Sequence, residues 1–341
     1  MQFLAVNSME EDIRLNYSSI CHPQRMYDTR FDMSNLPCAD THLFRFTVEE
    51  IAALCEHFLL PSTIVTQSRA RFDSDEALAI SLRRFAYPCR WVDLSGIFHR
   101  PISHLCEAFY YICDHIYDTF CHLLDFNVPS INYKFPEFSA KVHWKGGALR
   151  TCIGFLDGTF RPMCRPSINQ RECFSGHKRS HGLKFQGVKT PDGIIRQLYG
   201  PVEGRRHDAF MLRESGLLSV LENEMKLNGV QYCLYGDPAY PHFSFLQVPF
   251  AVPSTREQIA YNKSMASVRL AVEWAFKDIS SNWAFLDFKK NLKLYLSPVG
   301  QWYKVCAILT NCLTCLRQHN ETSLYFEMLP PRLEEYLQLR G

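Results

Sequence analysis

Three acidic residues are placed so that their carboxylates could act together on one substrate. Asp157 follows the apolar run CIGFL, Asp237 follows CLYG, and Glu273 lies in the helical pattern SVRLAVEWAFKDI. If the first two segments are neighbouring strands, both aspartates emerge at one rim of a sheet, and the later helix can bring Glu273 there. Carboxylates gathered at one point repel one another unless a cation lies between them. Mg²⁺ binds few carboxylates and keeps positions for phosphate oxygens, so the pattern predicts metal-assisted phosphoryl transfer.

Each acid also has a simpler structural explanation. Asp-Gly and Asp-Pro are common turn dipeptides, which accounts for either aspartate alone. Arg269, Glu273 and Lys277 recur at four-residue spacing, as in an exposed ladder of ion pairs on a helix. The catalytic hypothesis therefore depends on the three acids taken together.

A basic segment follows the first aspartate. Residues 161–206 contain ten Lys and Arg against three acidic residues, although the whole chain of 341 residues has a formal net charge of only +2. A local excess of this kind suits a phosphate backbone. The segment predicts that a polyanion lies beside the acidic site.

The elements that must position these residues change in character near residue 150. Before it, helical spacing predicts helices over 74–87, 90–100 and 101–124, either a helix-turn-helix-like unit or three helices of a bundle. After it, strands are predicted over 151–157, 183–190, 194–202 and 230–237, with PDG as a hairpin turn and AVPS (251–254) as a short fifth strand. Further helices are expected over 207–225, 256–281 and 298–316. This order predicts an α/β fold with a mixed sheet.

Composition limits the class of protein. No window approaches eighteen uncharged apolar residues, and the N-terminus lacks the basic flank and cleavage site of a signal peptide. The fourteen cysteines are scattered singly, which suits free thiols in a reducing compartment. We therefore expect a globular protein of a reducing compartment.

Five motifs, in this order, resemble the successive blocks of the DDE superfamily endonucleases of the PIF/Harbinger transposase type, which include harbinger transposase-derived nucleases: GFLDGTF, CFSGHKRSHGLKFQGV, GPVEGRRHD, YGDPAYP and NKSMASVRLAVEWAF. The 36 positions between Asp237 and Glu273 also agree with that family. The resemblance implies a ribonuclease-H-like core with a mixed five-stranded sheet flanked by helices, behind a small all-α helix-turn-helix-like region. It implies Asp157, Asp237 and Glu273 as catalytic acids and metal ligands, with Mg²⁺ or Mn²⁺ as cofactor, two ions in all.

The resemblance also implies an activity. Water would cut a transposon end by hydrolysis, and the freed 3′-hydroxyl would be joined to target DNA. The resemblance also implies a homodimer on DNA and a Myb/SANT-like partner protein. It implies nuclear localisation, possible through partner-dependent import, with the cytoplasm as the other location. Two alternatives stay open: a domesticated, catalytically silent DNA-binding protein, and a phosphatase or RNA nuclease on the same core.

Further residues match the family's motifs. Asp208 matches an additional acidic position and is either a metal ligand or a helix-capping residue. Phe160 replaces the histidine that many members carry after DGT. Six residues are assigned to DNA contacts, with a solvated loop and strand edge as the alternative: His177, Lys178, Arg179, Lys184, Arg205 and Arg206.

The predicted domain organisation has four parts. Residues 1–70 form a lead-in, 71–150 the helical domain, 151–316 the catalytic domain and 317–341 a C-terminal tail.

Overall fold

A computed structural model describes residues 41–338. The chain divides into two compact units. The first comprises residues 41–119 together with Asn282–Trp302, and the second comprises Phe120–Ser281 together with residues 303–338. Each unit is described by itself.

The first unit is helical with one small two-stranded sheet. Its elements are α2 (Thr41–Phe44), α3 (Val48–His57), β1 (Thr63–Val65), β2 (Arg71–Asp73), α4 (Ser74–Ala86), α5 (Trp91–Phe98), α6 (Ile102–Phe120) and two 3-10 turns, Ala284–Asp287 and Lys289–Asn291. Aromatic rings fill its core, with Phe109 lying 5.0 Å from Phe85 and 5.5 Å from Trp302 between ring centroids. The three helices predicted over 74–124 are confirmed. The region is not all-α, because β1 and β2 pair antiparallel within it.

The second unit contains the sheet. Its strands are β3 (Cys152–Pro162), β4 (Phe174–Ser175), β5 (Ser180–Lys189), β6 (Ile195–Glu203), β7 (Lys226–Leu227), β8 (Val230–Gln231), β9 (Cys233–Tyr235) and β10 (Leu246–Gln247). Its helices are α7 (Phe135–Trp144), α8 (Gln170–Cys173), α9 (Asp208–Glu214), α10 (Leu217–Glu224), α11 (Arg256–Asn282), α12 (Val299–Arg317), α13 (Glu321–Phe326) and α14 (Leu333–Leu337), with 3-10 turns at Cys121–Leu124 and Asn132–Lys134.

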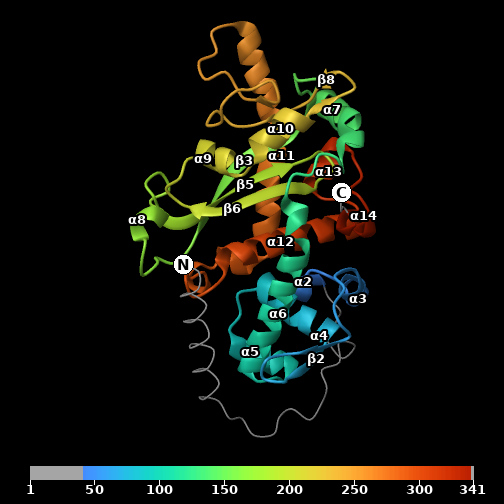
Figure 1. Cartoon of the computed structure of the whole chain (residues 1–341), viewed down its shortest axis with the longest axis vertical. Coiled ribbons are helices and arrows are strands. Elements are labelled where there is room, and N and C mark those ends of the chain that lie inside the picture. The colour runs from blue at the N-terminus through green and yellow to red at the C-terminus, as the bar shows by residue number, and fades with distance from the viewer. Residues whose placement is uncertain (1–40, 339–341) are drawn as a thin grey trace. The chain divides into compact units, whose positions relative to one another are not determined.

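The main sheet is mixed, as predicted. Strands β6, β5 and β3 pair antiparallel, and β9 and then β10 continue the sheet parallel to β3 (Figure 1). This order is consistent with the ribonuclease-H-like fold. The sheet has six strands instead of five, because the short β4 also pairs with β5.

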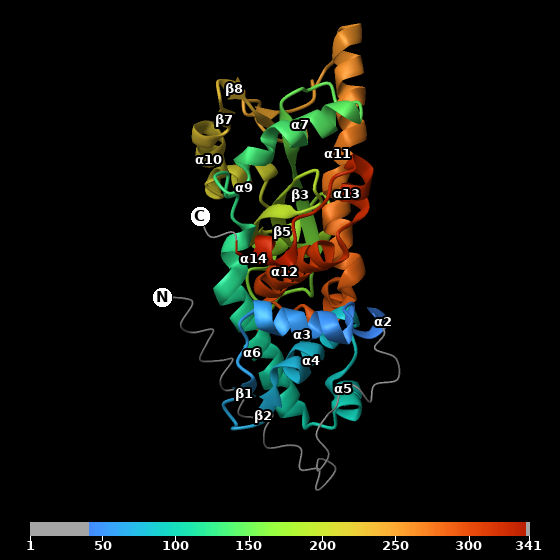
Figure 2. The same cartoon turned by 90° about the vertical axis from the view of Figure 1, so that its right-hand side faces the viewer.

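Helices cover both faces of this sheet. Helices α11 and α12 lie on one face (Figure 2). There the Phe276 ring of α11 lies against Gly187 of β5, and the Tyr303 ring of α12 lies 4.4 Å from that of Phe185. On the other face Gln186 of β5 donates a hydrogen bond to Ser215, directly after α9. Residues 185 and 187 share one face and residue 186 takes the other, as the alternation of a strand requires.

Several predicted boundaries were wrong. Strand β3 does not end at Asp157 but continues to Pro162, and residues 251–254 form no strand, since the last strand is β10. The helix expected over 207–225 is two helices, α9 and α10, separated at Gly216, whose φ of +70° lies in the left-handed region. Helices α13 and α14 lie in the segment predicted as a tail.

No helix within residues 41–338 has the length and apolar character that crossing a bilayer requires. The lead-in predicted over 1–70 falls largely outside the described residues.

Candidate active site

Strands β3 and β9 bring Asp157 and Asp237 to one region of the sheet. The two strands pair in parallel, with Phe155 opposite Tyr235, so each aspartate follows its strand's paired residue by two positions. The predicted neighbourhood of the two strands is therefore confirmed. The catalytic roles of the two aspartates stay predictions.

Asp157 stands where β3 leaves the core. Residues 152–156 are buried and residues 157–162 are only partly so, which explains why the apolar run stops at the aspartate although the strand continues. Burial raises the pKa of Asp157 to about 6, and the carboxylates of Asp237 and Glu273 act in the same direction. Arg269 and the Gly158 N–H, which donates to Asp157 Oδ1 at 2.9 Å, oppose that shift. The site thus holds an acidic group whose charged form is costly.

Asp237 begins a tight turn. Its Oδ1 accepts a hydrogen bond of 2.8 Å from the Ala239 N–H, so the turn role considered for this residue is real. Burial raises its pKa, and Asp208 acts in the same direction. The turn also places Tyr240 beneath Gly236, where the ring would lie 3.0 Å from a Cβ.

Helix α11 supplies Glu273 and a basic partner, Arg269. The Arg269 guanidinium donates to Glu273 Oε1 at 3.0 Å, and its Nη1 lies 3.4 Å from Asp157 Oδ2. Lys277 does not continue this ladder, because its ammonium pairs with Glu321 at 2.9 Å. Arg269 therefore joins the third predicted acid to the first.

Asp208 reaches the cluster from the opposite face of the sheet. Its carboxylate would lie only 3.0 Å from a Cβ on Gly158, so the missing side chain at 158 makes room for it. Lys184 of β5, predicted to contact DNA, donates to Asp208 Oδ1 at 2.9 Å. Asp208 thus lies beside Gly158, with Lys184 as its counter-ion.

The donor chemistry of this cluster fits a hard divalent cation. Carboxylate oxygens are the preferred protein ligands of Mg²⁺. Two buried polar atoms beside the acids also have no hydrogen-bond partner, the Tyr240 hydroxyl and Arg269 Nη1. No three His, Cys, Asp or Glu side chains within residues 41–338 converge as a formed metal site. The donors fit, and Arg269 lies among them.

Comparison with known proteins agrees with this arrangement. Residues 156–311, which contain all four acids, match the family model described as DDE superfamily endonuclease. A relative from Arabidopsis thaliana, Protein ALP1-like, is 22% identical over 166 residues, which cover 45% of this chain and 41% of that protein. The chain thus matches less than half of that relative's length. No solved structure matches the chain significantly.

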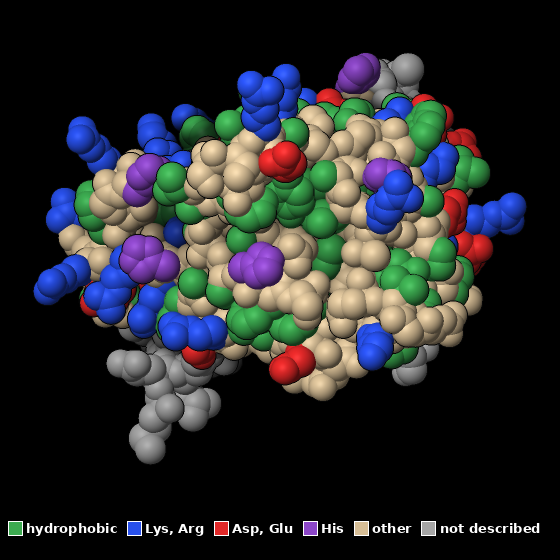
Figure 3. All heavy atoms as spheres, turned by 90° about the horizontal axis from the view of Figure 1, so that it is seen from above, with side chains coloured by type: hydrophobic (Ala, Val, Ile, Leu, Met, Phe, Trp, Pro, Cys, Tyr) green, Lys and Arg blue, Asp and Glu red, His purple; other side chains and the backbone are tan. Residues whose placement is uncertain are grey.

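The basic residues of the matched segment are separated by the fold into two groups. His177, Lys178 and Arg179 are exposed in the turn between β4 and β5, at the start of β5. Ser180 lies seven positions before Gly187, the residue opposite Asp157, which is about 23 Å along a strand. Figure 3 shows Lys and Arg side chains gathered toward one end of the face it presents. Of the six predicted DNA contacts, only Lys184 pairs with an acid of the cluster, Asp208.

The remaining basic residues are largely paired with nearby acids. Arg205 lies 3.7 Å from Glu172, and Arg206 lies 3.2 Å from Glu203. Two other members of the basic segment are buried: Lys189 pairs with Asp278, and Arg196 with Asp192. Arg161 is half-buried and donates to the Phe276 carbonyl. The basic excess read from the sequence is therefore only partly presented to solvent.

Phe160 has a packing role in the second unit. Its ring would lie 2.5 Å from a Cβ on Gly182 and 2.9 Å from one on Gly204. The two glycines therefore leave the space that the ring fills.

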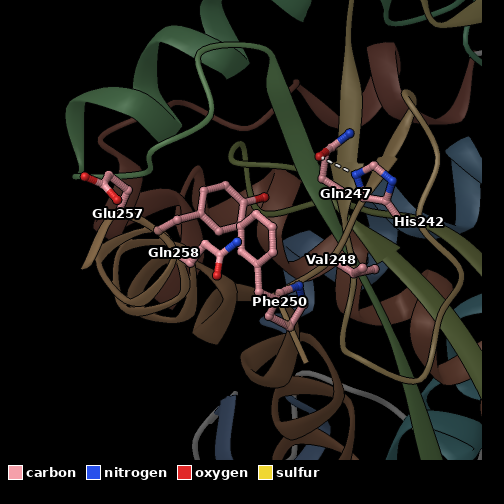
Figure 4. Close-up of a pocket in the computed structure, with 8 residues that line it drawn as sticks. His242, Gln247, Val248, Phe250, Glu257 and Gln258 are labelled. Atoms are coloured by element: carbon pink, nitrogen blue, oxygen red, sulfur yellow. Dashed lines mark hydrogen bonds between the residues drawn. The ribbon is translucent and has the colours of Figure 1, made fainter. Parts of the chain in front are cut away.

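A cavity of about 600 Å³ lies between the start of α11 and the loop around β10 (Figure 4). Phe250 and Tyr261 meet edge to face in its lining, with ring centroids 5.4 Å apart. The Gln247 Oε1 accepts a hydrogen bond from His242 Nε2 at 3.1 Å, and the Gln247 Nε2 donates to the Phe243 carbonyl at 2.8 Å. None of the predicted site residues lines this cavity.

Sequence reasoning missed two residues of the acid cluster, Arg269 and Tyr240. Arg269 was considered only as the partner of Glu273 at four-residue spacing, and its contact with Asp157 depends on long-range packing. Tyr240 lies in the motif YGDPAYP, three residues after Asp237. The turn geometry that brings it under Gly236 left no separate signal in the sequence.

Proposed function

We propose that this domain is a divalent-metal-dependent DNA endonuclease of the PIF/Harbinger transposase type. The observation that carries the proposal is the pairing of β3 with β9, which places Asp157 and Asp237 together, with Glu273 joined to them through Arg269. Four acids from four separate segments lie in this region, far more negative charge than a turn or a surface ion pair needs. The match of residues 156–311 to the family model described as DDE superfamily endonuclease supports the same conclusion.

The chain's own residues have distinct roles in this proposal. Asp157 and Asp237 would hold Mg²⁺ or Mn²⁺, with Glu273 and Asp208 completing the donor set from opposite faces of the sheet. The bound ions would supply activation of the attacking water and stabilisation of the leaving oxygen in phosphoryl transfer. Lys184 would shield Asp208, and the exposed turn at His177–Arg179 would contact the phosphate backbone.

The finer parts of the function rest on the resemblance to transposases. They are the cutting of transposon ends, the joining of the 3′-hydroxyl to target DNA, action as a homodimer, a Myb/SANT-like partner and a nuclear location. The name of the relative from Arabidopsis states none of these activities.

The test is Mn²⁺-dependent nicking of supercoiled DNA by the purified chain. Asp157→Asn, Asp237→Asn and Glu273→Gln should each lose nicking while remaining folded. Glu321→Gln is the matched control, because this acid pairs with Lys277 of α11 outside the cluster. Nicking that persists in all three site variants would show that the acids are not catalytic.

A catalytically silent DNA-binding protein on the same fold is the second candidate. The observation that favours it is Arg269, which already neutralises Asp157 and Glu273, together with the absence of a formed three-ligand metal site in residues 41–338. This candidate predicts DNA binding that is indifferent to Mn²⁺ and to substitution of the acids. A binding titration with and without Mn²⁺ separates the two.

A further inference from the structure

The guanidinium of Arg269 lies within the acid cluster and contacts two of its carboxylates. It contacts one oxygen of each of two carboxylates, Asp157 Oδ2 at 3.4 Å and Glu273 Oε1 at 3.0 Å. The Arg269 side chain is 24% exposed and that of Asp157 is 16% exposed, so water screens the contact between them only in part. This inference rests on the function proposed above.

Arg269 and a divalent ion would compete for the same lone pairs. A guanidinium binds carboxylates as a fork of N–H donors, whereas Mg²⁺ or Mn²⁺ needs the carboxylate oxygens themselves. An oxygen that accepts from Arg269 is directed toward a nitrogen and away from a common metal position. The two cations therefore cannot both hold Asp157 and Glu273 in their present arrangement.

The contacts of Arg269 are also incomplete. Its Nη1 is buried and makes no hydrogen bond. The residue Tyr240 is only 4% exposed, and its hydroxyl is buried without a partner near Asp208, Asp157 and Asp237. Buried polar groups in folded proteins are normally satisfied, so this packing around the guanidinium is poorly matched. A cation that leaves such groups unsatisfied is easier to displace than one in a complete network.

We propose that Arg269 is the resident counter-ion of the acid cluster and competes with the divalent cation, so that metal binding releases the guanidinium from Asp157 and Glu273. Arg269 is thus a positioning residue that keeps the acids together in the absence of metal. Its release leaves both carboxylates free to turn toward a common ion.

The experiment measures Mn²⁺ binding to the full chain, by titration calorimetry or by the paramagnetic signal of free Mn²⁺, at pH 8 and without DNA. Arg269→Gln removes the competing charge, and we expect its Kd for Mn²⁺ to fall about tenfold, the loss of one charge-assisted contact. Lys277→Gln is the matched control, because it removes one positive charge from the same helix outside the cluster. Its Kd should stay within about twofold of wild type.

A second variant guards against a folding defect. Arg269→Lys keeps the charge on a compact ammonium that cannot form the two-armed contact, and we expect a smaller gain in affinity. Adding Asp157→Asn to Arg269→Gln should abolish the gain, which places the ion at this cluster.

The outcomes separate this inference from the proposed function. If wild type binds Mn²⁺ and Arg269→Gln binds it equally or more weakly, Arg269 is no competitor, and the endonuclease proposal stands. If neither wild type nor Arg269→Gln binds Mn²⁺, both proposals fail. Tighter binding by Arg269→Gln with an unchanged Kd for Lys277→Gln supports the competition.

Discussion

Helix α11 is joined to the sheet by charged side chains at two places, and the two differ in their balance of charge. At one, Lys189 of β5 pairs with Asp278 at 3.0 Å, one cation with one anion, and the lysine side chain is only 1% exposed. At the other, Arg269 lies between Asp157 and Glu273, with Asp237 and Asp208 within electrostatic reach of the same acids.

The difference in charge balance distinguishes an ion pair with a structural role from a candidate ligand-binding site. A matched buried pair gives the helix a defined position on the sheet and needs nothing further. The second place has more carboxylates than cations, and such an excess is tolerated where a ligand of opposite charge completes it. The following experiments therefore test whether the excess of acids at the second place has a functional role and the matched pair a structural one.

The largest effect is expected at the matched pair. Asp278→Ala leaves the ammonium of Lys189 buried without its partner, and we expect a loss of about 3–5 kcal/mol in the free energy of unfolding. Denaturant titration measures it. The double variant Lys189→Met with Asp278→Leu should recover most of this loss, and a double variant as unstable as the single one would contradict a simple pair.

The next effect is on activity. Asp237→Asn should lower the Mn²⁺-dependent nicking rate at least about 100-fold, because a charge that stabilises the transition state is lost. The free energy of unfolding should not fall, since the asparagine oxygen can still accept from the Ala239 N–H. A variant that keeps its nicking rate would make Asp237 a turn residue only.

A smaller effect concerns pH. The pKa of Asp157 is raised from 3.8 to about 6, chiefly by burial, so the folded state binds this proton more tightly than the unfolded state does. The stability that the proton contributes is full below about pH 4 and is lost as pH rises through 6. Asp157→Asn removes the titrating group.

We therefore expect Asp157→Asn to be more stable than wild type at pH 8, by up to about 3 kcal/mol. The advantage should shrink as pH falls from 6 to 4. Thermal midpoints measured across this range provide the check. A difference that does not vary with pH would show that the carboxylate carries no burial cost.

The smallest effect is expected at the surface. Lys277 and Glu321 are 61% and 50% exposed, and exposed pairs contribute little because water and salt screen them. Lys277→Gln should leave the thermal midpoint unchanged within error. A clear drop would mean that this pair, and not only Lys189–Asp278, secures α11.

The sequence predicted the elements with a strong periodic signal. Helix α11 was expected over 256–281 and spans Arg256–Asn282, since its apolar residues recur at helical spacing. Strand β3 extends past Asp157 because residues 158–162 pair with β5 residue by residue, although they form no apolar run. Two-residue strands such as β4 and β10 leave too short a pattern to detect.

The candidate site was predictable in its acids and not in its cations. Strand order and the family's motifs gave Asp157, Asp237 and Glu273, and the structure brings them to one region. The contact of Arg269 with Asp157 joins a helix to a strand far away in the sequence, so spacing favoured Glu273 as its partner. Likewise, Lys189 and Arg196 counted as part of a basic surface, whereas packing takes both inside.

Gly158 has no side chain, so at this point only the backbone separates the charged groups on the two faces of the sheet. Charges on its two faces are separated by little more than one peptide layer, and Asp237 is influenced by Arg269 from one face and by Lys184 from the other. Substitutions of charged residues on opposite faces of the strand should therefore have non-additive effects on the free energy of unfolding, because a charge on one face changes the cost of ionising a group on the other. Because Gly158 has no side chain, charged groups on one face of the sheet act on the ionisable groups of the other face at short range.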